Sequence, residues 1–109
     1  MAVFAMCMPI LPGKLEMWKG MMAQVVDGPM SADFKASREA AGVHERTFLQ
    51  ETPNGHFIIL TFEGDDPQTA FANLMGNMDE DFKAFAAEVH GLDPEAPMSF
   101  PELVFDSRA

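Results

Sequence analysis

Cysteine is nearly absent from this chain of 109 residues, which contains Cys7 alone. One cysteine excludes an intrachain disulfide and any metal site built from several thiolates. The longest apolar stretch, at the start of the chain, falls well short of the ~20 residues that span a bilayer. That stretch also lacks the basic residues of a signal peptide. These absences predict a cytoplasmic protein.

Basic residues are scarce as well. Lys and Arg number 7 against 17 Asp and Glu, which gives a net charge of −10. A negative field repels phosphate backbones and anionic lipid headgroups. We therefore expect neither nucleic acid nor a membrane as a partner.

Metal and cofactor signatures are missing too. The chain has 3 histidines, and none stands three to five residues from another. Its 10 methionines are typical of adaptable core or interface filling, more than of haem or copper ligation. No phosphate-binding glycine loop, nucleophile elbow or dinucleotide fingerprint is found. We expect no metal and no cofactor.

The apolar pattern predicts alternating strands and helices. Residues 2–8 are apolar at every position, which is typical of a buried strand covered on both faces. The runs 43–52 and 56–64 flank Pro53-Asn54-Gly55, and this Asn-Gly pair predicts a tight antiparallel hairpin. One helix is expected over residues 14–26, and a second from a cap at Ser31 to Gly42. Two further helices should begin at the caps Asp66 and Asp79. A short last strand is expected at Leu103-Val104-Phe105.

This order predicts one α+β domain over residues 1–109 with the ferredoxin-like βαββαβ plan. Each helix of that plan is split in two, and all of them cover one face of an antiparallel sheet. The apolar first strand indicates that the other face is covered as well. A second copy of the chain would cover it most simply, giving a homodimeric α+β barrel.

Several segments carry a family resemblance: VHERTFLQETPNGHFIILTFEGDDP, then EVHGLDP, then PELVFDS. Together they resemble small stand-alone dimeric α+β barrel proteins, distant relatives of the antibiotic-biosynthesis monooxygenase-like (ABM-like) superfamily. Characterised members of that superfamily include cofactor-independent oxygenases, isomerases, decarboxylases and haem-handling enzymes. The resemblance implies a fold and a dimer, but it carries no diagnostic catalytic signature.

Alternation along the hairpin divides its side chains between two faces. One face carries Glu45, Thr47, Leu49, Glu51, Ile58, Leu60 and Phe62. The other mixes polar groups with aromatic walls, as a pocket does, and carries His44, Arg46, Phe48, Gln50, Phe57, Ile59, Thr61 and Glu63. This second face is either a ligand pocket or a surface turned to solvent or to a dimer seam. Arg46 either anchors a carboxylate or enolate oxygen or pairs across the strands with Glu63.

The pocket hypothesis groups Arg46 and Phe48 with Trp18 and His90. His90 lies near the end of the last predicted helix. It could serve as a general acid or base near neutral pH, or it could hydrogen-bond the C-terminus of its own helix.

Two functions fit these observations. The first is binding of a small hydrophobic organic ligand, in contact with Trp18, Phe48, Gln50, Phe57, Ile59 and Thr61. The alternative is a cofactor-independent oxygenase or isomerase acting on a small organic substrate, with His44, Arg46 or His90 handling a proton or an oxyanion. A cavity around convergent polar groups would favour the enzyme, and an interior filled by methionine and phenylalanine would favour a binding or structural role.

Overall fold

The computed structural model describes residues 2–93 and 99–108, and within them the chain forms an antiparallel sheet of three strands and four helices. The elements follow as β1 (Ala2–Ile10), α1 (Leu15–Val26), α2 (Ser31–Ala41), β2 (Val43–Thr52), β3 (Gly55–Gly64), α3 (Pro67–Gly76) and α4 (Glu80–His90). Pairs of helices alternate with strands, so the α+β class is confirmed, and the order of these elements is roughly that of the ferredoxin-like plan.

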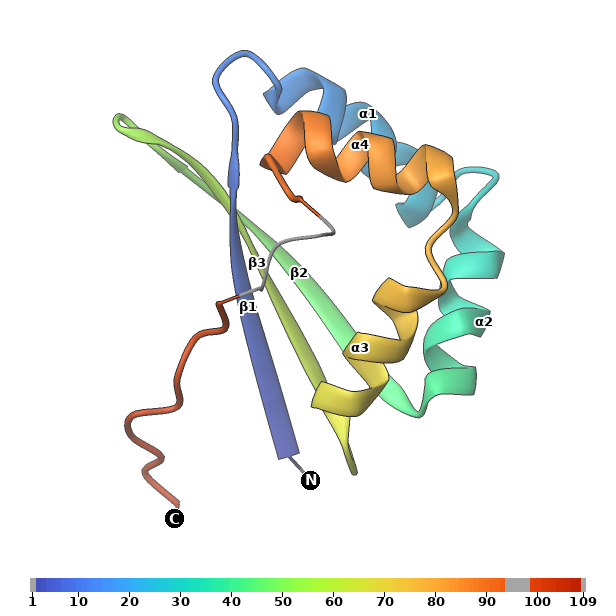
Figure 1. Ribbon diagram of the computed structural model, residues 1–109, viewed down its shortest axis with the longest axis vertical. Coiled ribbons are helices and arrows are strands. Elements are labelled where there is room, and N and C mark those ends of the chain that lie inside the picture. Colours follow the sequence, from blue (N-terminus) through green and yellow to red (C-terminus); the bar gives the residue numbers. More distant parts are fainter. Residues whose placement is uncertain (1, 94–98, 109) are drawn as a thin grey trace.

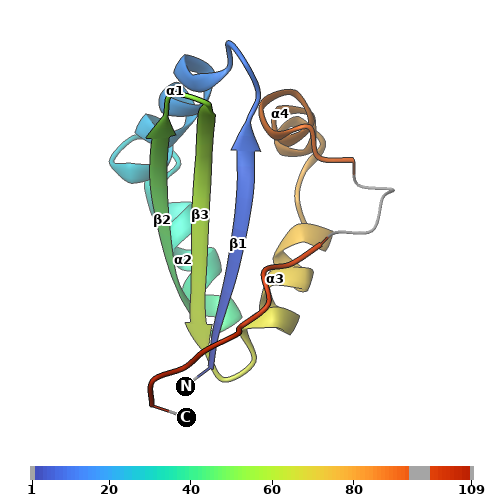
Figure 2. The same ribbon diagram turned by 90° about the vertical axis from the view of Figure 1, so that its left-hand side faces the viewer.

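The sheet has the order β1-β3-β2, with β3 antiparallel to both neighbours. All the helices lie on one side of it (Figure 1). The opposite side, which faces the viewer in Figure 2, is bare of helices. We call this side the open face, and it carries Val3, Ala5, Cys7, Pro9, His44, Arg46, Phe48, Gln50, Phe57, Ile59, Thr61 and Glu63.

The core lies between the sheet and the helix layer. Even-numbered residues of β1 and β3 point into it because side chains alternate along a strand. Phe62, on the central strand β3, is 2% exposed and packs with Phe4 and Phe71. The fully or nearly buried apolar residues are Phe4, Met6, Met8, Ile10, Trp18, Val43, Ile58, Phe62, Ala70, Phe71, Ala86 and Val89.

Helix ends mostly follow the predicted capping residues. Asp66 and Asp79 accept hydrogen bonds from the backbone N–H of Thr69 and Phe82, as N-caps do. The prediction for Ser31 is wrong: Met30 is the N-cap of α2, and the Ser31 hydroxyl donates to the Val26 carbonyl at 3.1 Å. The chain turns sharply between α1 and α2, which brings that carbonyl within reach.

The hairpin forms as predicted, but its turn is shifted by one residue. Thr52 pairs with Gly55, so Pro53 and Asn54 form the loop. Gly55, with φ of 137°, begins β3, while no non-glycine residue among those described has a positive φ. The positive φ angle of the turn therefore falls on Gly55 alone, whereas a turn centred on Asn54-Gly55 would have given Asn54 a positive φ as well.

Two predictions about the outer strands need correction. Leu103-Val104-Phe105 is irregular, with no strand in residues 99–108. Phe100 already packs on Phe4 near the start of β1, so little of β1 remains for a later segment to pair with. The first strand is covered on one face only in the single chain, and Cys7, expected to be buried, is exposed on the open face.

Candidate functional site

The hairpin residues predicted to share a face do share it. The register pairs His44 with Glu63, Arg46 with Thr61, Phe48 with Ile59 and Gln50 with Phe57. Val3 is 60% exposed, Phe48 52% and Phe57 37%, so the apolar part of this face lies uncovered in the single chain. The open face is a broad surface that mixes aromatic and polar side chains.

Arg46 on the open face pairs with Glu63, as one of the two sequence interpretations expected. Its Nη1 lies 3.5 Å from Glu63 Oε1, and the two side chains are 49% and 35% exposed. An ion pair this exposed contributes about 0–1 kcal/mol to stability because water screens it.

Trp18 and His90 lie on the other side of the sheet. Trp18, on α1, is 7% exposed and belongs to the core cluster beneath the helix layer. His90, the last residue of α4, is also 7% exposed. The sheet separates both from Arg46 and Phe48, so one pocket lined by all four residues does not exist in this chain. The alternation of side chains placed Arg46 and Phe48 correctly, but it could not show which face the helices cover.

His90 connects α4 to β1 instead of capping its own helix. Its Nδ1 lies 2.8 Å from the Pro9 carbonyl oxygen, and nearby the backbone N–H of Leu11 donates to the Val89 carbonyl at 2.7 Å. A carbonyl can only accept, so Nδ1 carries the hydrogen and donates. Burial lowers the pKa of His90 below its usual 6.5, and the hydrogen bond to Pro9 opposes that shift only in part. The ring is therefore neutral at pH 7.

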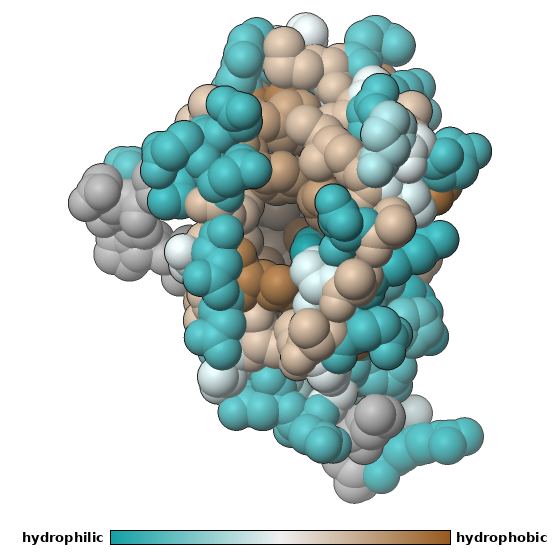
Figure 3. All heavy atoms as spheres, turned by 90° about the vertical axis from the view of Figure 1, so that its right-hand side faces the viewer, coloured by the Kyte–Doolittle hydropathy of each residue, from teal (hydrophilic) through white to brown (hydrophobic). Residues whose placement is uncertain are grey.

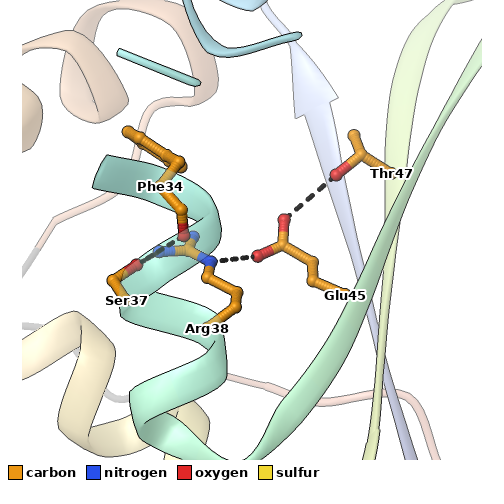
Figure 4. A network of polar contacts seen from close by, with 5 residues as sticks. All are labelled: Phe34, Ser37, Arg38, Glu45 and Thr47. Atoms are coloured by element: carbon orange, nitrogen blue, oxygen red, sulfur yellow. Dashed lines mark hydrogen bonds and ion pairs between the residues drawn. The ribbon is translucent and has the colours of Figure 1, made fainter. Parts of the chain in front are cut away.

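A polar network lies beneath the helix layer, between α2 and β2 (Figure 4). Arg38 Nε donates to Glu45 Oε1 at 2.6 Å, and Thr47 Oγ1 donates to Glu45 Oε2 at 3.1 Å. Arg38 Nη1 donates to Ser37 Oγ at 2.8 Å. The guanidinium carbon lies 4.7 Å from the centre of the Phe34 ring, which adds a cation–π contact.

This network is more enclosed than the pair on the open face. The Arg38 and Glu45 side chains are 24% and 18% exposed. A guanidinium has more N–H donors than the two that Glu45 and Ser37 take up. Nη2 and one N–H of Nη1 stay outside the hydrogen bonds among the described residues. Arg38 can thus give further hydrogen bonds to an oxygen atom that approaches it.

The helix layer itself is hollowed at its centre. Figure 3 looks onto this layer and shows a hollow whose walls are largely apolar. Around the core, the helices and the sheet leave a further set of apolar side chains only partly buried. They include Met22, Leu49, Leu60, Leu74, Met75 and Phe85. Flexible methionine and leucine side chains can adapt to an apolar molecule.

Sequence reasoning did not single out Arg38, Ser37, Glu45 or Thr47 as site residues. The sequence did contain a signal for these residues. Glu45 and Thr47 lie on the same face of β2 as Leu49, and the register places this face beside Leu60 and Phe62. A carboxylate on such a face needs a partner to offset its desolvation. That the partner is Arg38 follows only from the packing of α2 on β2.

Comparisons of the chain with protein-family models, with curated proteins and with solved structures return no match. Within the described ranges, His, Cys, Asp and Glu side chains do not gather in groups of three or more that could hold a metal ion. In the same part of the chain, no helix combines the length and the apolarity needed to cross a bilayer.

Proposed function

We propose that the chain binds a small, largely apolar organic molecule in the hollow of the helix layer, with one oxygen atom of that molecule hydrogen-bonded to Arg38. The observation that carries this proposal is the partly exposed guanidinium beneath the helices, with N–H donors beyond those that Glu45 and Ser37 use. The Arg38 side chain is 24% exposed, so an oxygen atom can approach it. A pocket of apolar walls with a few polar groups is the usual form of a small-molecule site.

The charge around Arg38 selects the kind of molecule. Glu45 already neutralises the guanidinium at 2.6 Å, and the whole chain carries a net charge of −10. An anion would meet repulsion from both. A neutral molecule with a carbonyl or hydroxyl oxygen accepts hydrogen bonds from Arg38 without that cost.

The same proposal includes a homodimer formed through the open face. Val3, Phe48 and Phe57 are exposed there next to Cys7, and an apolar surface of this kind is typical of an interface. A twofold axis would cover both open faces at once. The resemblance to dimeric α+β barrel proteins implies the same arrangement.

The catalytic alternative, a cofactor-independent oxygenase or isomerase, needs a side chain free to exchange a proton with the bound molecule. Both carboxylate oxygens of Glu45 already accept hydrogen bonds, from Arg38 and Thr47. The His90 side chain is only 7% exposed, with its Nδ1 donating to the Pro9 carbonyl, and His44 and Arg46 lie on the open face. These contacts favour binding over catalysis.

Titration with Nile red tests the binding site, because this dye is uncharged, mostly apolar and carries a carbonyl oxygen. Arg38→Lys keeps the charge and loses the planar donors, and we expect it to weaken binding about tenfold, the value of one hydrogen bond of ~1.4 kcal/mol. Arg46→Lys is the matched control and should leave the dissociation constant unchanged. Equal weakening by both variants, or by neither, would contradict the proposal.

Native mass spectrometry of the purified chain separates binding from catalysis. A co-purified molecule, or Nile red added in its place, should be released chemically unchanged. Release of a chemically altered molecule would favour the enzyme.

A further inference from the structure

Three phenylalanines form a row of aromatic rings between α2 and α4, which lie side by side in the helix layer (Figure 1). The ring centre of Phe34, on α2, lies 5.7 Å from that of Phe82, on α4, and the ring centres of Phe82 and Phe85 lie 6.0 Å apart. These distances and the tilted ring planes are typical of paired aromatic side chains. All three residues are only partly buried, so the row leaves part of its ring surface open.

Helical spacing brings this row next to Arg38. Residues three or four apart share a helix face, so α2 presents Phe34 together with Arg38, and α4 presents Phe82 together with Phe85. The guanidinium carbon of Arg38 lies 4.7 Å from the centre of the Phe34 ring. An oxygen atom bonded to Arg38 lies only about 3 Å from the donating nitrogen. The group that carries this oxygen therefore comes to lie beside the Phe34 ring.

Packing of the core does not account for Phe34 and Phe82. Among the described residues, neither belongs to the buried core or to the partly buried side chains that pack against it, whereas Phe85 does pack against it. Helix α2 itself contributes no buried residue. Phe34 instead contacts Phe82 and Arg38. Leaving part of these two rings in water costs free energy, and an apolar molecule that covers them removes that cost.

We propose that Phe34 and Phe82 determine the specificity of the site, and that they select a flat aromatic molecule over a saturated molecule of the same skeleton. This inference rests on the proposed binding site at Arg38 and names the class of its ligand. An aromatic ring gains edge-to-face or offset contacts with these two rings beyond the burial of apolar area. Because Arg38 adjoins Phe34, the oxygen of the ligand is attached directly to its ring system, as in a neutral phenol or an aryl ketone.

Isothermal titration calorimetry with two matched molecules tests this specificity. 2-Naphthol and decahydro-2-naphthol share their carbon skeleton and one hydroxyl group, but only the first is aromatic. We expect 2-naphthol to bind about tenfold more tightly, although the saturated molecule is at least as apolar. Equal affinities, or tighter binding of the saturated molecule, would overturn the inference and leave the binding site standing. If neither molecule binds, the inference fails, and the Nile red titration decides whether the proposed site fails with it.

Substitutions assign the preference to the two rings. Phe34→Leu and Phe82→Leu each keep an apolar side chain and remove the ring, and together they should bring the affinities of the two molecules to within about twofold of each other. Phe57→Leu, on the open face, is the matched control and should leave the tenfold preference unchanged. A loss of folding would weaken the binding of both molecules, and the comparison in the wild-type chain does not depend on it. A preference that survives the double substitution, or that Phe57→Leu lowers equally, would overturn the inference.

Discussion

Two Arg–Glu pairs lie back to back across the sheet, and they differ in almost every respect. Glu45 and Arg46 are neighbours in β2, so their side chains point to opposite faces. Glu45 meets Arg38 at 2.6 Å beneath the helices, with 18% and 24% exposure. Arg46 meets Glu63 at 3.5 Å on the open face, with 49% and 35% exposure. The same ion pair is half-buried and closely hydrogen-bonded on one side of the sheet, and it is a solvated surface pair on the other.

The largest expected effect compares two phenylalanines of β3. Phe62 is 2% exposed and Phe57 is 37% exposed. Phe62→Ala should lower the free energy of unfolding by about 3–5 kcal/mol, because it leaves a cavity in the core. Phe57→Ala should cost about 1 kcal/mol or less at protein concentrations where the chain is monomeric. Urea unfolding of both variants measures the difference, and similar losses would mean that the two faces are equally buried.

The enclosed Arg–Glu pair should give the next largest effect. Arg38→Ala leaves Glu45 partly buried without its cation, and we expect a loss of about 2–3 kcal/mol in urea unfolding. Replacing both residues, Arg38→Met with Glu45→Leu, should restore part of this loss, since no charge is then left unpaired. A loss below ~0.5 kcal/mol in the single variant would place the pair in solvent.

A pH dependence follows from His90. Burial holds the pKa of its ring below 6.5 in the folded chain, so the unfolded chain takes up this proton first as the pH falls. The unfolded state then binds more protons, and the free energy of unfolding drops between about pH 7.5 and 5.

Comparison with His90→Gln, which retains a donor for the Pro9 carbonyl, isolates the contribution of His90. Over this pH window the stability advantage of the wild-type chain over His90→Gln should shrink as the pH is lowered. A stability difference between the two chains that stays constant with pH would contradict the lowered pKa of His90.

The smallest effect is expected on the open face. Arg46→Ala should change the free energy of unfolding by about 0–1 kcal/mol, because water already solvates both partners of its ion pair. A loss as large as that of Arg38→Ala would remove the contrast between the two pairs.

Much of the fold could be predicted from the sequence because its signals are local. The Asp66 and Asp79 caps, Gly42 and the alternation along the hairpin depend only on neighbouring residues. The extent of the helices and the sorting of the hairpin side chains follow from them.

The face that carries the candidate site could not be predicted in the same way. Both faces of the hairpin mix apolar and polar residues: Glu45 lies beneath the helices, and Phe48 lies on the open face. Only the packing of α2 decides which polar groups become enclosed. The apolar run Leu103–Phe105 has the local character of a strand, but whether a strand forms depends on a free partner strand. Phe100 already packs on Phe4 near the start of β1, which the sequence pattern does not show.

Methyl NMR on adjacent residues of β3 tests the division between the faces most directly. Leu60 points toward the helix layer and Ile59 lies on the open face. Titration with Nile red should shift the Leu60 methyl signals and leave Ile59 in place. Dilution of the protein should shift Ile59 and leave Leu60 in place. A Nile red shift at Ile59, or a dilution shift at Leu60 without one at Ile59, would contradict the assignment of ligand binding to one face and self-association to the other.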